Sequence, residues 1–125
     1  MQPLEVIWIP DHMIKPPGPK MVVCIQPYMG FFFRINSHSN WEPCVPIARE
    51  PHHRFLRHDS FIECRILELD DYIIAEAMRG RGVIGRVSRD LCEPLCVAIG
   101  GAGFSRDDRT AIRAVLEPLI PRIKR

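Results

Sequence analysis

The residues best suited to chemistry flank two short apolar segments, residues 21–25 and 31–35. Four polar side chains adjoin them: Lys20 before the first segment, and Arg34, Asn36 and Ser37 at the end of the second. Short apolar runs separated by a few residues that include proline and glycine are typical of a β-hairpin. Because the start of one hairpin strand lies beside the end of the other, we expect a cation, an amide and a hydroxyl to meet at one edge. This edge is the first place where we expect a functional site.

Arginine predominates among the 17 basic residues and is concentrated in two places. Its planar guanidinium suits two-point contacts with phosphate. One loop combines arginines with histidines: Arg49, Arg54, Arg57, His52, His53 and His58. A second group lies in a stretch without acidic residues: Arg79, Arg81, Arg86 and Arg89. Both groups fit a surface that contacts phosphate, and both fit ordinary solvated charge.

The histidines and cysteines could bind a metal ion or serve other roles such as packing in the core, and their spacing bears on that choice. Adjacent histidines of one loop seldom converge on a single zinc ion, so His52, His53 and His58 predict neither a metal nor another cofactor. The five cysteines form no Cys-x-x-Cys pair, and they indicate neither a disulfide framework nor a zinc ribbon. Cys92 and Cys96 stand one helical turn apart, where core packing is preferred to metal binding. The Phe31–Phe33 run also favours the core, although one ring could stack on a base.

The apolar pattern predicts strands first and helices afterwards. Strands are expected at residues 4–9, 21–25, 31–35, 43–47 and 60–69, with a brief one at 83–87, and helices at 70–78, 88–99 and 105–119. Pro10 closes the first strand, and the proline-rich residues 10–19 form an exposed loop. Asp70, Ser88 and Ser105 are the expected helix caps. Pro94 lies inside the second helix, which must therefore kink or start late.

Length and composition fit one globular domain. The chain has 125 residues, of which 46% are hydrophobic and 26% charged, and its net charge of +2 does not by itself predict a nucleic-acid binder. No apolar run approaches the roughly 18 residues of a membrane span, and residues 1–5 lack the features of a signal peptide. We therefore expect a cytoplasmic α+β protein without a membrane partner. We expect a single domain, residues 1–125, with an antiparallel barrel over about residues 4–69 and helices over about residues 70–120.

Several segments, in this order, resemble the MazF/PemK-like toxins of bacterial toxin–antitoxin systems. LEVIWIP resembles the family's opening strand, PGPKMVVCIQPY the strand that follows a basic residue, FFFRINS the strand that ends in small hydroxyl residues, and LRHDSFIEC a later strand opened by an Asp-containing segment. GVIGRVS and the helix after it also fit the family pattern. The resemblance implies an SH3-like barrel with C-terminal helices. It further implies a homodimer that cleaves single-stranded RNA without a metal and is inhibited by an antitoxin protein.

The resemblance also implies roles for particular residues. Lys20 stands at the family's basic position and would hold phosphate, while Asn36 and Ser37 stand at the hydroxyl pair. His58 and Asp59 lie near the Asp-containing segment, and histidine suits proton transfer near neutral pH. These five are the catalytic candidates. The candidates for RNA binding are Arg34, Arg49, Arg54, Arg57 and Ser60.

Lys20 and Asn36 differ from the Arg and the hydroxyl of the family pattern, because lysine lacks the guanidinium fork and an amide does not shuttle protons. A second hypothesis is therefore a non-catalytic module on the same barrel, which contacts nucleic acid or a protein tail through its arginines. A third is a metal-dependent hydrolase that uses the histidines.

Overall fold

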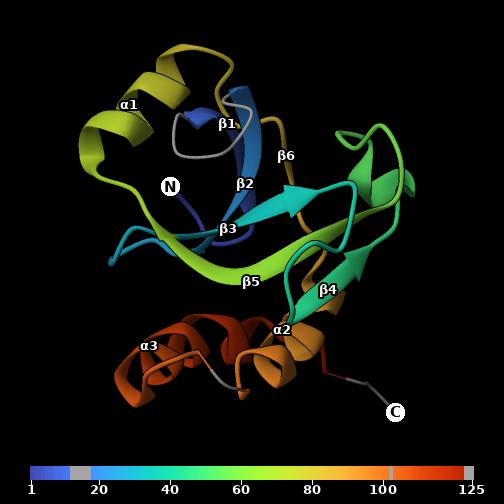
Figure 1. The fold of residues 1–125 in the computed structure, drawn as a ribbon, viewed down its shortest axis with the longest axis vertical. Coiled ribbons are helices and arrows are strands. Elements are labelled where there is room, and N and C mark those ends of the chain that lie inside the picture. The colour runs from blue at the N-terminus through green and yellow to red at the C-terminus, as the bar shows by residue number, and fades with distance from the viewer. Residues whose placement is uncertain (12–17, 102, 123–125) are drawn as a thin grey trace.

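The computed structural model describes residues 1–11, 18–101 and 103–122. In that part of the chain, six strands form one antiparallel sheet in the order β4-β5-β3-β2-β1-β6 (Figure 1). The strands are β1 (Glu5–Asp11), β2 (Gly18–Gln26), β3 (Phe31–Asn36), β4 (Cys44–Ile47), β5 (Ser60–Glu68) and β6 (Gly85–Arg86). The helices are α1 (Asp71–Arg79), α2 (Cys92–Ala98) and α3 (Arg106–Leu116), with short 3₁₀ turns η1 (Pro51–His53), η2 (Arg89–Leu91) and η3 (Glu117–Leu119). The predicted α+β class is confirmed, with the sheet curled into half a barrel.

Strands β2 and β3 form the predicted hairpin at the centre of the sheet. Met21 pairs with Ile35, and Val23 pairs with Phe33. Successive side chains of a strand point to opposite faces, yet Val22 and Val23 are both fully buried. Burial on both faces explains why the apolar residues of this hairpin do not alternate with polar ones.

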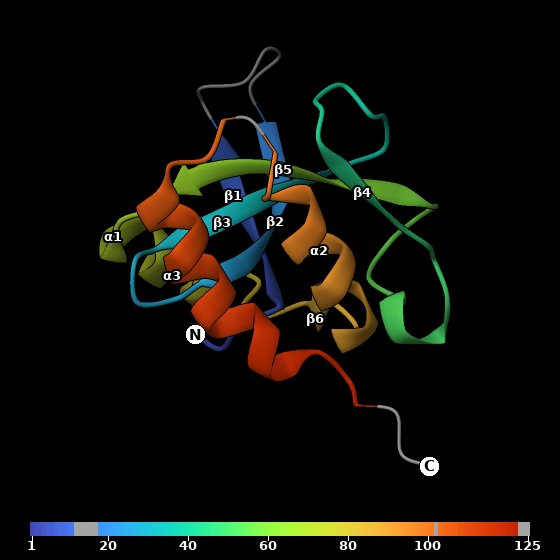
Figure 2. The ribbon, with the colours of Figure 1, turned by 90° about the horizontal axis from the view of Figure 1, so that it is seen from below.

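Two apolar clusters cover the two faces of the sheet. The main core joins alternate residues of β2 and β3, such as Val23 and Phe33, to Leu95 of α2 and Ile112 of α3. The second core joins the residues between them, including Val22 and Phe32, to α1. Figures 1 and 2 accordingly show α2 and α3 together on one side of the curled sheet, with α1 on the other.

Several strand boundaries differ from the prediction. The first strand runs past Pro10 to Asp11, because Pro10 pairs with Pro19. The second begins at Gly18, so Lys20 lies inside it and not at its entrance. Residues 12–17 of the predicted proline-rich loop lie outside the described residues. Strand β4 is at the sheet edge as predicted, and only Gly85–Arg86 of the expected 83–87 strand pairs with β1.

The predicted caps at Asp70 and Ser105 are confirmed, whereas Ser88 caps the turn η2 and not α2. The Asp70 carboxylate accepts a 2.9 Å hydrogen bond from the Ile73 amide, and the Ser105 hydroxyl accepts one of 3.1 Å from the Asp108 amide. The Ser88 hydroxyl accepts from the Asp90 amide of η2, and α2 begins only at Cys92. The helix thus starts late, which places Pro94 in its first turn, where an amide hydrogen has no partner to lose. None of the helices in the described residues is long and apolar enough to cross a membrane.

Candidate functional site

A pocket of about 590 Å³ lies where β2 begins and β3 ends, next to the start of β5. Its floor is the open end of the main core, where Met21, Ile35 and Ile84 line it. Around that floor stand the cations Lys20, Arg57 and Arg81, the polar side chains Asn36, Ser37, His58 and Ser60, and the rings Trp8 and Phe55. We call this the basic pocket. It brings together predicted residues from three separate segments of the chain.

Lys20 and Asn36 face each other across the hairpin. The pairing of Met21 with Ile35 puts the preceding Lys20 beside the following Asn36. The Lys20 ammonium donates a hydrogen bond to Asn36 Oδ1, and both side chains are half-buried. Because an ammonium group carries three hydrogens, this bond fixes its position and leaves donors for a ligand.

His58 and Ser60 enter the pocket from the turn that precedes β5. His58 Nδ1 lies 3.2 Å from the Asp59 carbonyl oxygen, and the buried Ser60 hydroxyl donates to the His58 carbonyl oxygen at 3.0 Å. The Ser60 hydroxyl oxygen also lies 3.5 Å from His58 Nδ1, so Nδ1 has two polar neighbours within the turn. The turn thus presents an exposed imidazole at the pocket.

Asp59 and Arg49 hold the same loop together. The Asp59 carboxylate accepts a 2.7 Å hydrogen bond from the Arg49 amide, and Arg49 Nε donates to the Leu56 carbonyl oxygen at 2.9 Å. Asp59 is not among the residues that line the basic pocket, and Arg49 and Arg54 line a separate surface hollow. Their observed contacts position the loop.

Arg34 also lies away from the pocket lining. It sits in β3 between Val22 of β2 and Glu63 of β5, its cross-strand neighbours. Among the predicted RNA-binding residues, the pocket lining thus includes Arg57 and Ser60.

Trp8 and Arg81 form one wall of the pocket. Trp8 was not predicted as a site residue, and Arg81 was predicted only as a member of the second arginine group. The Arg81 guanidinium carbon lies 4.8 Å from the centre of the Trp8 ring, within the range of a cation–π contact. Trp8 alternates along β1 with Ile7 and Ile9 of the second core, so its ring points to the opposite face. That alternation could have placed Trp8, but nothing in the sequence pairs it with Arg81.

Phe55 forms another wall and is wedged in place. A methyl group on Gly85 would stand 2.2 Å from the Phe55 ring, so the ring packs directly against the β6 backbone. His53 packs edge-on to Phe55, with ring centres 5.8 Å apart. The sequence does not reveal this role of Gly85, because the close approach joins segments thirty residues apart.

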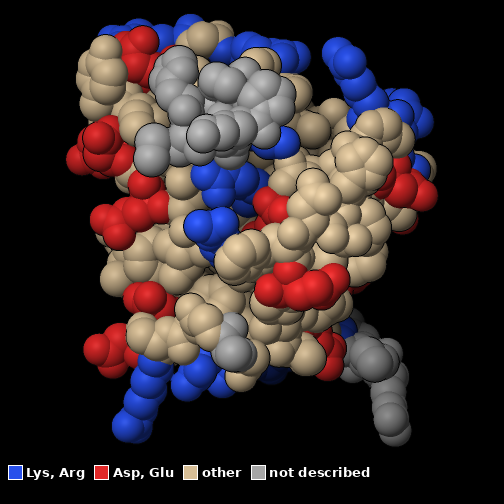
Figure 3. All heavy atoms as spheres, viewed as in Figure 1, with Lys and Arg blue, Asp and Glu red and all other residues tan. Residues whose placement is uncertain are grey.

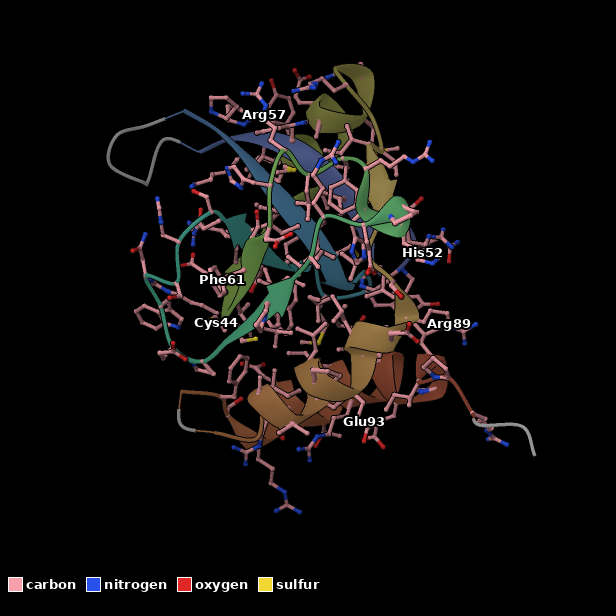
Figure 4. The ribbon with its side chains drawn as sticks, turned by 90° about the vertical axis from the view of Figure 1, so that its right-hand side faces the viewer. Cys44, His52, Arg57, Phe61, Arg89 and Glu93 are labelled. Carbon is pink, nitrogen blue, oxygen red and sulfur yellow. The ribbon has the colours of Figure 1, made fainter. Side chains whose placement is uncertain are left out.

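His53 is a structural histidine. It is buried, its Nδ1 lies 2.9 Å from the Ala48 carbonyl oxygen, and its Nε2 accepts a 2.9 Å hydrogen bond from the Ser88 amide. His52 is exposed and lies well apart from Arg57 in Figure 4. No group of three His, Cys, Asp or Glu residues in ranges 1–11, 18–101 and 103–122 is placed to hold a metal ion.

Cys24, Cys64, Cys92 and Cys96 pack in the two cores as small apolar residues, as predicted for Cys92 and Cys96. Cys24 and Cys64 are buried, and burial raises the pKa of each thiol to about 12. Burial likewise raises the pKa of Cys92 to about 11. These thiols stay protonated near neutral pH and are poor nucleophiles there.

The charge around the basic pocket is one-sided. No Asp or Glu belongs to the described residues that line it. Figure 3 shows Lys and Arg side chains near the centre of the face where β2 and β3 lie, with acidic side chains next to them. Other arginines of the second predicted group bind within the protein: Arg79 pairs with Glu76, Arg86 lies 3.7 Å from Glu5, and Arg89 donates to the Leu119 carbonyl oxygen.

The chain was also compared with known proteins. No model of a protein family, no curated protein and no solved structure matches it.

Proposed function

We propose that the protein is a MazF/PemK-like endoribonuclease that cleaves single-stranded RNA in the basic pocket without a metal. The observation that carries the proposal is the convergence of Lys20, Asn36 and His58, with Ser37 and Arg57, in one pocket. Cations with no acid among the described lining residues suit a polyanion, and an exposed imidazole suits proton transfer.

The polar residues suffice for an internal attack of RNA on its own phosphate. His58 Nε2 removes the proton of a ribose 2′-hydroxyl, and the 2′ oxygen forms a bond to the adjacent phosphorus. The bond to the 5′ oxygen breaks, and that oxygen takes a proton from the Lys20 ammonium. The products are a 2′,3′-cyclic phosphate and a 5′-hydroxyl. Ser37 and Asn36 orient the reacting groups.

The charge that grows on the phosphate needs fixed positive groups. Lys20 is held by Asn36, and Arg57 brings a guanidinium from the β4–β5 connection to the same pocket. Fixed donors aimed at developing charge commonly contribute several kcal/mol to transition-state stabilisation. Both residues are therefore assigned to the phosphate.

The architecture and partners belong to the same proposal. The curled antiparallel sheet with packed helices is compatible with an SH3-like barrel. By the resemblance described above, the protein acts as a cytoplasmic homodimer, and an antitoxin blocks it by laying an extended segment in the RNA site. A one-sided basic pocket suits an acidic segment for the same reason that it suits RNA.

The test is cleavage of labelled single-stranded RNA in the presence of EDTA. We expect wild-type protein to cleave, and His58→Ala to lose about 10²- to 10⁴-fold in rate, the usual range for a general base. Lys20→Ala should lose a comparable factor. His52→Ala is the matched control, because His52 is an exposed histidine of the same loop outside the pocket.

Two results would contradict the assignment: RNA left intact by wild type, or equal rates for wild type, His58→Ala and Lys20→Ala. Binding without cleavage would favour the alternative, a non-catalytic module on the same fold. In that case the affinity for RNA should fall steeply with salt, because cations that bind phosphates release counterions.

A further inference from the structure

The wall formed by Trp8 and Arg81 has no part in the chemistry proposed above, yet it borders the reacting groups. Trp8 is half-buried, and Arg81 is exposed and stacks on its ring. Lys20 and Arg57 line the same pocket. A flat ring and a flat guanidinium beside a phosphate site are the parts from which proteins build stacking platforms for single-stranded nucleic acids.

The backbone fixes the place of Arg81. Its two neighbours are glycines that end α1: the Gly80 amide donates to the Glu76 carbonyl oxygen and the Gly82 amide to the Ala77 carbonyl oxygen, each at 3.0 Å. Gly82 has a φ of +68°, which glycine adopts without the steric cost of a side chain. The turn therefore holds Arg81 over Trp8 at the end of a helix that packs on the second core.

Trp8 and Arg81 also border a second hollow of about 380 Å³, so they stand between two spaces. The second hollow is largely apolar and is lined by Ile9, Pro19 and Ala77, with one carboxylate, Glu76, which pairs with Arg79. Pro19 lines both spaces as well. A nucleotide has the same division, with a charged phosphate at one end and a flat, largely apolar base at the other.

A similar pair elsewhere in the molecule has different surroundings. The Arg65 guanidinium carbon lies 4.4 Å from the centre of the Trp41 ring. That pair lines a hollow of about 330 Å³ together with the carboxylates Glu42, Glu68 and Asp108. We call it the acidic hollow. Its carboxylates would repel a phosphate, so Trp41 and Arg65 are not expected to hold a nucleotide there.

We propose that Trp8 and Arg81 form a base-stacking subsite, which holds the base of the nucleotide whose phosphate lies at Lys20 and Arg57. The subsite rests on the proposed function, because it takes RNA as the ligand. Stacking does not require one particular base, since every base has a flat face. The subsite therefore positions the strand for cleavage and tolerates different sequences.

The experiment measures binding of a cleavage-resistant probe to full-length protein. The probe is a random-sequence pool of 2′-O-methyl RNA of about ten nucleotides, within the span of known single-strand sites. A second probe has the same length and charge but consists of abasic residues. Affinity is measured for every variant by the fluorescence anisotropy of end-labelled probes. Tryptophan fluorescence is recorded separately in Trp41→Phe protein that retains Trp8, so that Trp8 alone reports. Arg81→Ala is compared with Arg65→Ala, the matched change at the other pair.

We expect the RNA pool to quench Trp8 fluorescence and to bind about tenfold or more tightly than the abasic probe, as stacking of one base allows. Arg81→Ala and Trp8→Leu should remove most of this preference for bases, whereas Trp8→Phe and Arg65→Ala should retain it. Because Arg81 is exposed, its replacement leaves the core intact and its result stands even if Trp8→Leu unfolds.

Two failures can be told apart. If wild type cleaves RNA but binds both probes equally, with unchanged Trp8 fluorescence, the base subsite is wrong and the proposed function stands. If wild type neither binds nor cleaves any RNA, the proposed function is wrong and the subsite with it.

Discussion

The basic pocket and the acidic hollow each contain an arginine stacked on a tryptophan, but the charges around the two pairs have opposite sign. In each, an arginine stacks on a tryptophan within 5 Å of the ring centre, at 4.8 Å for Arg81 on Trp8 and 4.4 Å for Arg65 on Trp41. Lys20 and Arg57 share the first space, whereas Glu42, Glu68 and Asp108 share the second. Under the proposed function the stacked pair alone therefore does not define a nucleic-acid site, and the charge of the remaining walls decides which pair contacts RNA.

The two regions also differ in what supports them. The floor of the basic pocket is the end of the main core, and its Phe55 wall is wedged between Gly85 and His53. The acidic hollow lies beside β5 and the loop before α3, where Phe104 packs edge-on to Phe33 at 6.2 Å. Changes that act on one region should therefore leave the other intact, which allows each to serve as the control for the other.

The largest effect on folding stability is expected from Gly85→Ala. The added methyl group would lie 2.2 Å from the Phe55 ring, so the ring or the β6 backbone must move. Overpacking of this kind costs about 1–3 kcal/mol of folding stability, and displacement of Phe55 should also weaken RNA binding at the basic pocket. Urea denaturation and the binding assay measure the two losses.

Gly18→Ala provides the control, because an added methyl group at Gly18 would have no neighbour within 4 Å among residues 1–11, 18–101 and 103–122. It should unfold at nearly the same urea concentration as wild type. A Gly85→Ala variant as stable as Gly18→Ala, with unchanged RNA binding, would show that the Phe55 wall is not wedged as described.

A smaller effect is expected on the reactivity of a thiol placed in each region, because that reactivity depends on the local electrostatic potential. Burial and the nearby Glu42 carboxylate raise the pKa of Cys44, which flanks the acidic hollow. A Ser37→Cys substitution places a thiol beside Lys20 and Arg57, and neighbouring cations lower a thiol pKa. Below both pKa values a lower pKa means more reactive thiolate, so at pH 7 we expect alkylation at position 37 to be several-fold faster than at Cys44.

The rates are followed by mass spectrometry of iodoacetamide-treated protein between pH 6 and about 9, where thiols begin to ionise. Lys20→Ala combined with Ser37→Cys should slow the reaction at position 37. Equal rates at both positions would mean that the basic pocket has no positive potential.

The strands and caps were predictable because they depend on local chemistry. Apolar runs bounded by proline and glycine gave the hairpin, and the Asp70 and Ser105 caps each depend on one side chain and an amide three residues later. Boundaries were less accurate where pairing prevails over local preference. Pro10 lies inside a strand because Pro19 lies opposite it, which no local rule contains.

The site was predictable to the extent that hairpin geometry determines it. Lys20 and Asn36 had to face each other once residues 21 and 35 were paired. Arg81 and Phe55 could not be predicted, because their places depend on the turn after α1 and on the absence of a side chain at Gly85. Asp59 was predicted to be catalytic and Arg49 to bind RNA. Instead, the Asp59 carboxylate accepts a hydrogen bond from the Arg49 amide, and the Arg49 side chain donates to the Leu56 carbonyl oxygen. The spacing of these residues in the sequence does not reveal those contacts.

The most direct test of the central claim uses the two tryptophans of the chain, Trp8 and Trp41, as reporters of the two regions. In ¹⁵N-labelled protein their indole N–H groups give separate NMR signals, which Trp8→Phe assigns. On titration with the cleavage-resistant RNA pool, the Trp8 signal should shift until saturation while the Trp41 signal stays in place. A shift of Trp41 with Trp8 unmoved, or no shift of either at saturating RNA, would contradict the assignment of the basic pocket as the RNA site.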